Sequence, residues 1–333
     1  MTFETQDVER KALSILKVLA GEEEPVGSIV IARKLKDLGI DLGERAVRYH
    51  LRMMDEQGLT RLAGRRDGRV ITPQGQKELK QGMVRDKVGF ALSRIELLAF
   101  RTTFDLEKRS GMVPVNITVF KRADFQKALQ LMKPVISSRL TVSNLVVAER
   151  AGEKIGDFIV PSDSVGLATV CSIVVNGTLL KAGIPMDSKF GGLLQMQDHE
   201  PLRFVELIHY AGCSLDPSEI FIKAGMTSVS HTVKSGHGNI LANFREIPAI
   251  CRPIAHDVIS SLARAGINGV LVFGSVSEPV CEVAVELNRV GIVLVGGLNP
   301  VAAVEEAGIE VESHAMSSVV EYKELVDFEE FIQ

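Results

Sequence analysis

The spacing of apolar residues changes near residue 112, and this change restricts the chain to a fold with two unlike domains. Up to about residue 82, apolar residues recur at helical spacing in short segments bounded by glycine, proline and capping residues. From Pro114 onward, short apolar runs rich in β-branched residues alternate with capped helices, as in an α/β domain. A chain of 333 residues is about twice a typical domain length, so each part can form its own core.

The first domain, expected at residues 1–82, has the pattern of a winged helix-turn-helix. Apolar spacing and capping residues predict three short helices joined by tight turns, at residues 7–20, 28–36 and 44–57. Two short strands around an arginine-bearing turn predict a hairpin between Leu59 and Thr72. Thr72 and Pro73 are residue types that cap and open a closing helix, which ends near Lys80. Three helices and a hairpin together predict a winged helix.

The third predicted helix carries positive charge on one face. Val47, Leu51 and Met54 recur on one side, while arginine and tyrosine recur on the other. The segment 45–69 holds seven arginines against three acids, although the whole chain has a net charge of −4. This pattern predicts a helix that enters the major groove of duplex DNA, with the hairpin on phosphate or in the minor groove. A solvated basic surface, or binding of RNA or protein, is the alternative. The candidate DNA contacts are Arg45, Arg48, Tyr49, Arg52, Arg65, Arg66 and Arg69.

The second domain, expected at residues 112–333 after a junction at 83–111, is predicted to contain two α/β lobes. Strands are expected at 115–120, 144–149 and 269–273, the last one buried on both faces, and helices at 123–137 and 254–265. Asp216 and Pro217 begin a further helix, with Glu219 placed for a capping box. The Asn-Gly and Gly-Gly-Leu sequences within 176–193 are repeated within 268–298, which indicates two related lobes unless the match is due to chance. Two lobes imply a cleft between them.

No arrangement of residues in the sequence predicts an enzyme active site. His231 and His237 are six residues apart and have no acid at the spacing of a metal-binding motif. The four cysteines are widely spaced, which predicts reduced thiols. The chain begins without the pattern of a leader peptide, and no apolar run is long enough for a membrane-spanning helix. We therefore expect a cytoplasmic protein that needs no cofactor, metal or membrane.

Five segments of the second domain follow one another in an order that resembles the archaeal nitrogen-regulation repressors of the NrpR type. They are GTLLKAGIP at 177–185, FGGLL at 190–194, DPSEIFI at 216–222, NFREIP at 243–248 and GGLNP at 296–300. With the winged helix before them, the resemblance covers nearly the entire chain. It implies a homodimeric repressor of nitrogen-assimilation genes that 2-oxoglutarate releases from operator DNA. Some members of this family carry two regulatory domains in tandem and this chain has room for one, so the resemblance implies a homodimer or a separate regulatory-domain partner.

A dicarboxylate effector requires cationic donors together with backbone N–H groups at helix starts or glycine turns. Arg245 is the best-placed cation because its apolar surroundings leave it in need of a partner, which is either the ligand or an acid such as Glu246. His237, between two glycines, either forms a turn or touches a ligand, and Cys171 belongs either to the core or to the site. The candidate effector contacts are Thr169, Cys171, Ser172, Lys181, His237, Arg245, Gly296, Gly297 and Asn299.

The sequence therefore predicts a ligand-responsive transcriptional repressor that is not an enzyme. Two alternatives remain open. The first is an α/β metabolic enzyme whose winged helix regulates its own expression, which turnover of a keto acid would indicate. The second is an RNA-binding winged-helix protein, which would prefer single-stranded RNA to duplex DNA in the same salt.

Overall fold

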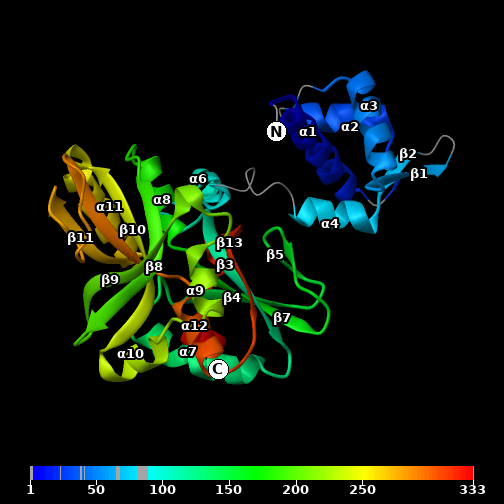
Figure 1. Cartoon of the computed structure of the whole chain (residues 1–333). Helices are drawn as coiled ribbons and strands as arrows, with labels where there is room; N and C mark the ends of the chain where they lie inside the picture. Colours follow the sequence, from blue (N-terminus) through cyan, green and yellow to red (C-terminus); the bar gives the residue numbers. More distant parts are fainter. Residues whose placement is uncertain are drawn as a thin grey trace. The chain divides into compact units, whose positions relative to one another are not determined.

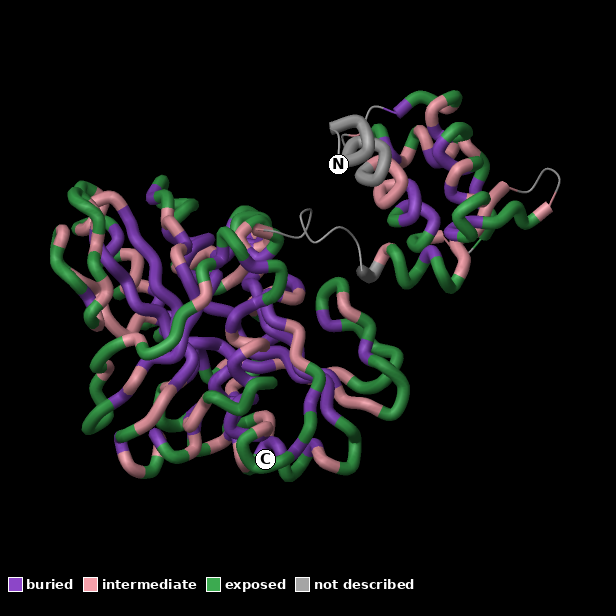
Figure 2. Tube along the Cα trace, in the orientation of Figure 1, coloured by how far each residue is buried: buried purple, intermediate pink, exposed green. Residues whose placement is uncertain are grey.

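The computed structural model describes residues 3–22, 24–37, 40, 42–64, 68–81 and 89–332, which form two compact units (Figure 1). The first unit spans residues 1–88 and the second spans residues 89–333. Figure 2 shows buried residues inside each unit, and separate apolar clusters account for them. Each unit therefore has a core of its own.

The first unit is a winged helix, as predicted. Its helices are α1 (Phe3–Ala20), α2 (Ser28–Asp37), α3 (Glu44–Glu56) and α4 (Pro73–Gln81), and its hairpin consists of β1 (Thr60–Gly64) and β2 (Gly68–Ile71). Leu16 of α1, Leu35 of α2 and Leu51 of α3 are fully buried in one apolar cluster. The Thr72 hydroxyl accepts a hydrogen bond from the Gly75 N–H at 3.0 Å, so Thr72 caps α4 as predicted.

The second unit contains two five-stranded sheets, and the pairings between their strands are antiparallel. The strand order is β13-β3-β7-β4-β14 in the first sheet and β11-β12-β10-β8-β9 in the second. The first sheet consists of β3 (Met112–Lys121), β4 (Leu145–Arg150), β7 (Ser164–Val170), β13 (Glu312–Glu321) and β14 (Val326–Asp327). The second consists of β8 (Asp187–Gln197), β9 (Glu200–His209), β10 (Gly238–Pro248), β11 (Val270–Val276) and β12 (Arg289–Val295). A small hairpin, β5 (Lys154–Ile155) and β6 (Phe158–Ile159), forms a two-stranded sheet of its own.

The helices of the second unit form two groups around these sheets (Figure 1). In one group, α12 (Asn299–Glu306) packs against α7 (Phe125–Ser137), α9 (Pro217–Lys223) and α10 (Val229–Ser235). In the other, α8 (Ile173–Lys181) packs against α6 (Phe90–Arg101) and α11 (Arg252–Arg264), and a short α13 (Phe328–Phe331) follows β14. The predicted combination of a winged helix with a larger, two-lobe domain of helices and sheets is confirmed.

The second unit is built from two copies of one arrangement. Strands β4, β7 and β8 begin at residues 145, 164 and 187, and strands β11, β12 and β13 begin at residues 270, 289 and 312, which is 125 residues later in each case. The sheet orders correspond as well, because β13-β3-β7-β4 matches β8-β10-β12-β11 position by position. The last strand of each copy is exchanged: β8 joins the sheet of the second copy, and β13 returns to the sheet of the first. The chain therefore connects the two lobes twice.

The residues that suggested two related lobes are not the ones that correspond. Residues 176–180 lie inside α8, whereas 268–272 lead into strand β11. The two similar sequences therefore form different secondary structures. The corresponding turns are Ala182-Gly183-Ile184 after α8 and Ala307-Gly308-Ile309 after α12, in which both glycines have a positive φ, of 78° and 81°. A residue with a positive φ at the end of a helix is most often glycine. Both copies therefore have glycine at this position.

Two boundaries differ from the sequence-based expectation. The interval 83–111, expected as a junction, contains α6, whose Ala91, Ile95 and Leu98 are buried in the core of the second unit. The second unit therefore begins at Gly89. Residues 269–273 do lead into a strand, but β11 is at the edge of its sheet and only partly buried, because it pairs with β12 alone.

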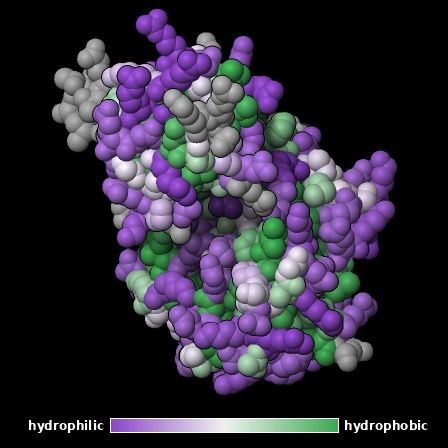
Figure 3. Space-filling view, turned by 90° about the vertical axis from the view of Figure 1, so that its right-hand side faces the viewer, coloured by the Kyte–Doolittle hydropathy of each residue, from purple (hydrophilic) through white to green (hydrophobic). Residues whose placement is uncertain are grey.

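In the described part of the chain, no helix is long and apolar enough to cross a bilayer. On the face shown in Figure 3, hydrophobic residues form small patches between hydrophilic ones. Exposed apolar side chains of this scattered kind are normal on the surface of a globular protein.

Candidate DNA-contact face and central cavity

Helix α3 presents opposite chemistry on its two sides. Val47, Leu51 and Met54 are buried in the core of the first unit. The other side of the helix is exposed to solvent and carries the side chains of Arg45, Arg48, Tyr49 and Arg52. Tyr49 is 62% exposed, an unusual position for a large aromatic side chain that contributes nothing to the core. We call these four residues the α3 face.

Two of the candidate DNA contacts have partners within the first unit. Arg48 pairs with Glu44 one turn earlier, and its Nε donates to the Ser28 hydroxyl at 3.3 Å. The Nε of Arg69 lies 2.8 Å from Oδ2 of Asp55, whose other oxygen accepts from the Thr60 hydroxyl at 2.6 Å. Arg69 therefore holds the hairpin against the end of α3. The residues next to it in the sequence did not predict this structural role.

The remaining candidates divide into exposed and undescribed residues. Arg45 and Arg52 are exposed on α3, while Arg65 and Arg66 lie outside the described residues. Arg61 is exposed on β1 and is a further cation, which the sequence-based set omitted. Because successive side chains of a strand point to opposite faces, its solvent-facing position could have been predicted.

The second unit encloses a small cavity of about 20 Å³. Its walls come from both sheets, from the turns that open α8 and α12, from the turn at Tyr210 and from the start of α9. The lining residues are Asn116, Cys171, Ser172, Ile173, Tyr210, Asp216, Ser218, Asn243, Arg245, Gly297, Leu298, Ala315 and Met316. We call this the central cavity.

Corresponding segments of the two structural copies meet at the central cavity. The turn 171–173 opens α8, and the turn 296–298, which lies 125 residues later, opens α12. Asn116 pairs with Thr169 in the first sheet, and Asn243 pairs with Leu294, the residue 125 positions after Thr169, in the second. Neither helix start has a side-chain cap. Two helix N-termini directed at one cavity favour an anion, because their first N–H groups have no partner within the helix.

Arg245 gives the cavity its charge. The side chain is 1% exposed, its Nε has no hydrogen-bond partner, and no acid forms an ion pair with it among the described residues. The guanidinium donates to the Ser188 hydroxyl and lies 5.6 Å from the centre of the Tyr210 ring. Burial lowers the pKa of Arg245, since the charged form loses its hydration, and the nearby Asp216 acts in the opposite direction. In the first copy the corresponding position is Thr118, so only one lobe supplies this cation.

Glu246, the acid that could have paired with Arg245, lies on the other side of strand β10. Its Oε2 is 3.3 Å from Lys189 Nζ and 3.6 Å from Arg289 Nε. Successive side chains of a strand point to opposite faces, so the two neighbours cannot share one environment. Glu246 is therefore paired with Lys189 and Arg289, and it does not form the structural ion pair with Arg245 that its position in the sequence allowed.

A chain of polar groups forms the wall next to Arg245. The Tyr210 hydroxyl donates to Asn243, and Asn243 Nδ2 donates to the Ser172 hydroxyl at 3.4 Å. Asp216 is buried and accepts from the Ser218 N–H at 2.7 Å, which confirms that it caps α9. Burial raises the pKa of Asp216, because its charged form is poorly solvated. Burial also raises the pKa of the Cys171 thiol to about 12, so this cysteine is not a thiolate nucleophile.

The structure brings together about half of the candidate effector contacts. Cys171, Ser172, Arg245 and Gly297 line the central cavity, and the Thr169 hydroxyl donates to the Gly297 carbonyl at 3.1 Å.

Gly296 and Asn299 have structural positions beside the central cavity. A side chain at Gly296 would collide with Leu241, and Asn299 bonds the Leu241 backbone at 2.8 and 3.1 Å. Asn299 is the first residue of α12, not the cap that its residue type suggested.

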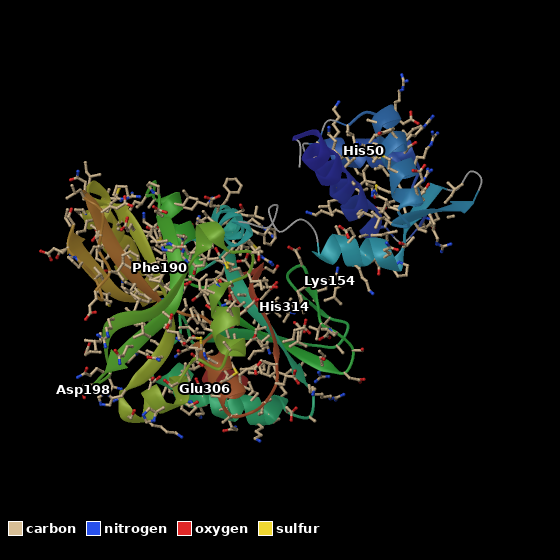
Figure 4. The ribbon with its side chains drawn as sticks, viewed as in Figure 1. His50, Lys154, Phe190, Asp198, Glu306 and His314 are labelled. Carbon is tan, nitrogen blue, oxygen red and sulfur yellow. The ribbon has the colours of Figure 1, made fainter. Side chains whose placement is uncertain are left out.

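Lys181 and His237 lie away from the central cavity. The ammonium of Lys181 donates to the Phe100 carbonyl at 3.3 Å on the outside of the unit. His237 is exposed, and its Nε2 lies 3.3 Å from Asp198 Oδ1. Figure 4 shows Asp198 at the β8–β9 turn, beyond Phe190 along β8. The positive φ of Gly236 and Gly238 supports the turn interpretation of this segment.

Nine of the lining residues were absent from the sequence-based set, among them the polar residues Asn116, Tyr210, Asp216 and Asn243. Asn116 and Asn243 gave a usable signal, because each is a polar residue inside an otherwise buried strand. No cluster of potential metal ligands occurs among the described residues.

Comparison with known proteins connects both units to regulators. Residues 88–327 match the family model described as NrpR regulatory domains NRD1 and 2, and residues 13–79 match the model of the ribonuclease R winged-helix domain. The chain is similar to the global nitrogen regulator NrpRI of Methanosarcina mazei, with 38% identity over 95% of this chain and 97% of that protein.

Two further relatives are longer than this chain. The global nitrogen regulators NrpR of Methanococcus maripaludis and Methanocaldococcus jannaschii are 32% and 33% identical over 92% and 96% of this chain. The chain spans 53% and 55% of their lengths, about half in each case.

A solved structure shares the fold of the regulatory part. The crystal structure of a nitrogen repressor-like protein from Methanococcus jannaschii matches 72% of this chain and 98% of its own length, with a TM-score of 0.61 and 26% identity. Family model, relatives and solved structure agree, and the chain belongs to the NrpR family.

Proposed function

We propose that this protein is a nitrogen-responsive transcriptional repressor that binds operator DNA through its winged helix and releases it when 2-oxoglutarate occupies the central cavity. Its relatives are named regulators, so a non-enzymatic role follows from the family. The proposed place of action is the cytoplasm, where promoter DNA and the metabolite are both present.

The DNA-binding part of the proposal rests on the α3 face. A winged helix reads DNA with the helix that follows its tight turn, and α3 occupies that position. Arg45 and Arg52 are exposed there and can pair with guanine O6 and N7, while Arg61 on the hairpin can contact phosphate.

The effector part rests on one observation, a buried Arg245 that forms no ion pair among the described residues. A guanidinium in a low-dielectric interior is costly to keep without a counter-ion. Two helix N-termini and the amides of Asn116 and Asn243 surround the same cavity. A carboxylate would satisfy the Arg245 fork, and the polar wall offers hydrogen bonds to a second carboxylate or a keto oxygen.

The size of the cavity indicates how binding would act on DNA. A cavity of about 20 Å³ has room for roughly one water molecule, far less than a dicarboxylate needs. Binding therefore requires the two lobes to move apart around residues 171–173 and 296–298. An effector that prefers the open arrangement shifts the protein away from the closed one, and this is the requirement for coupling to DNA affinity.

Titration calorimetry with 2-oxoglutarate tests the proposal on the wild-type protein and on Arg245→Met. Methionine keeps most of the side-chain volume and removes the charge, so ligand binding should fall by about 100-fold or more while the fold is retained. Lys181→Ala is the matched control, because it removes a cation of the same unit that lies outside the cavity, and it should bind like wild type.

Two results would contradict the proposal. An absence of heat with wild type at millimolar ligand would exclude 2-oxoglutarate as the effector. Equal affinities of wild type and Arg245→Met would place the site elsewhere in the protein.

We further propose that the active form is a homodimer. One winged helix covers little of a DNA site, and specific sites are commonly held by two-fold related pairs. The presence of one regulatory unit in a chain half as long as two of its relatives supports the same view. Light scattering on the full-length protein should give about twice the chain mass, and a monomer at micromolar concentration would contradict this.

RNA is a second candidate ligand, because the model that matches residues 13–79 is described for ribonuclease R. Competition between a duplex promoter fragment and single-stranded RNA in the same salt distinguishes the two. We expect the duplex to bind more tightly, since the cationic residues of α3 form a helix face suited to a major groove.

A further inference from the structure

Helix α6 is the first element of the second unit, and it follows the segment 82–88 that leads from the winged helix. It is anchored in that unit, because Ala91, Ile95 and Leu98 are buried in the core. Helix α6 therefore connects the core of the second unit with the part of the chain that precedes it in sequence. Two groups of contacts connect α6 with the walls of the central cavity.

The first contact is at the N-terminal end of α6. The Ala91 N–H donates to the Cys213 carbonyl at 3.2 Å, and the Cys213 N–H in turn donates to the Tyr210 carbonyl at 3.2 Å. Tyr210 lines the cavity, and its ring lies against the Arg245 guanidinium. The backbone turn that positions this ring is thus bonded directly to α6.

The second contact runs through Arg94. Its guanidinium donates to the Ser317 carbonyl at 3.2 Å. Ser317 belongs to an irregular segment of β13, residues 315–317, where the pairing with β3 is interrupted between His314 and Ser318. Ala315 and Met316 of this segment line the cavity, and Met316 has a φ of 51°, a strained value for a residue with a side chain.

Side chains from three different elements hold the 315–317 segment in place. The Ala315 N–H donates to Glu219 of α9 at 2.5 Å, the Met316 N–H donates to Asn116 of β3 at 3.0 Å, and Arg94 of α6 bonds Ser317. Because the strand ladder is interrupted here, these bonds replace it. A segment held in this way can change partners without unfolding the sheet.

The charge of Arg94 acts on two acids at the start of α9. Burial raises the pKa of Asp216 and of Glu219, and the positive charge of Arg94 acts in the opposite direction on both. Asp216 lines the cavity together with Arg245. Arg94 is therefore coupled by charge to the same wall that it contacts by hydrogen bonding.

We propose that Arg94 is the positioning residue that couples occupancy of the central cavity to helix α6, and through α6 to the winged helix. This inference rests on the proposed function. When the lobes move apart to admit a ligand, the Tyr210 turn and the 315–317 segment move with the cavity walls to which they belong, and both are bonded to α6. Arg94 is not one of the residues that line the central cavity, and it belongs to the second unit and not to the winged helix, so its removal should separate ligand binding from DNA release.

Operator affinity measured with and without 2-oxoglutarate tests the inference. Wild type should lose about 5- to 150-fold in operator affinity on adding ligand. For Arg94→Ala we expect a change of less than about 3-fold. Calorimetry on the same variant should give a ligand affinity close to that of wild type, which a merely destabilised protein would not show.

Two further variants separate coupling from stability. Arg94→Lys keeps a donor for the Ser317 carbonyl and should retain most of the response. Arg101→Ala removes another arginine of α6, one that pairs with Asp157 at 3.0 Å in the β5–β6 hairpin, and it should respond like wild type. A full wild-type response in Arg94→Ala would overturn the inference.

A measurement on the wild-type protein covers the case in which Arg94→Ala fails to fold. Amide hydrogen exchange should change in α6 and in residues 315–317 when 2-oxoglutarate is added, and unchanged exchange in α6 would overturn the inference. If wild type neither binds nor responds to the ligand, the proposed function fails and this inference falls with it. That outcome is distinguishable, because it is seen in the wild-type protein alone.

Discussion

The two arginine-bearing regions of this protein differ in one physical respect, which is access to water. On the α3 face, Arg45 and Arg52 are exposed, and water solvates their charge. In the central cavity, Arg245 is 1% exposed and forms no ion pair with any acid that the structure describes. The same residue type therefore has opposite energetic consequences in the two units.

This difference separates two kinds of recognition. Exposed arginines can exchange water for phosphate or a base edge at little cost to the fold, so the winged helix is stable with or without DNA. A buried guanidinium destabilises the empty protein, and an anion that enters relieves this cost. The second unit is thus suited to sense a small acid, and the first to bind a polyanion.

The α3 face gives the largest expected effect. Replacing Arg45 and Arg52 together by alanine should weaken operator binding by about 2–6 kcal/mol, because each can contribute ~1–3 kcal/mol at a guanine. Stability should stay within about 0.5 kcal/mol of wild type, since both side chains are exposed. Fluorescence anisotropy at physiological salt measures the first quantity and denaturant unfolding the second. Lys77→Ala, an exposed cation on α4, is the control, and an equal loss in that variant would show that the α3 face is not specific.

The central cavity gives the converse effect, a gain in stability. Arg245→Met should raise the free energy of unfolding by about 1–4 kcal/mol, because an unpaired buried charge is replaced by an apolar side chain of similar volume. Denaturant unfolding of the ligand-free protein measures it. A large loss of stability would instead show that Arg245 has a structural partner, and the contrast with the α3 face would disappear.

Glu219 should make the stability of the second unit depend on pH. Burial raises its pKa from 4.5 to about 7, so between these values the native protein holds a proton that the unfolded chain has released. Stability falls as the pH rises through this window, and the loss is complete above it. Glu219→Gln keeps the acceptor for the Ala315 N–H and removes the charge. It should match wild type below pH 4.5 and be more stable by ~1–3 kcal/mol above pH 7. A constant difference across this range would contradict the buried position of the carboxyl.

Arg69 provides the smallest effect and tests the first unit alone. Because it pairs with Asp55 at 2.8 Å, Arg69→Ala should lower stability by about 1 kcal/mol and weaken DNA binding less than Arg45→Ala does. Thermal unfolding and anisotropy of the two variants decide this. A DNA-binding loss equal to that of Arg45→Ala, with unchanged stability, would restore Arg69 to the set of DNA contacts.

Local patterns predicted the winged helix almost completely. The α3 boundaries, the buried side made by Val47 and Leu51, and the Thr72 cap are determined by residues a few positions apart, and short-range spacing records such relations. The partner of Arg69 was not predictable in this way, because Asp55 is on a different element.

The central cavity shows the limit of such patterns. The apolar neighbours of Arg245 identified it as a candidate site residue. Whether it pairs with Glu246 depends on which face of β10 each side chain occupies. The candidates Lys181 and His237 lie on the outside of the unit, and nothing in their local sequence indicates this. Asn116 and Tyr210 reach the cavity from segments about 90 residues apart, and only the paired sheets bring them together.

Residue spacing and composition were sufficient to predict the two domains, the charge of the α3 face, the helices and hairpin of the winged helix and the family that five ordered motifs indicated. The exchange of β8 and β13 between the lobes, the burial of Arg245 with no ion pair among the described residues and the bond from Arg94 to Ser317 depend on tertiary packing. Helix capping and periodicity reflect interactions between residues a few positions apart, whereas the desolvation of a charge depends on every segment that packs around it.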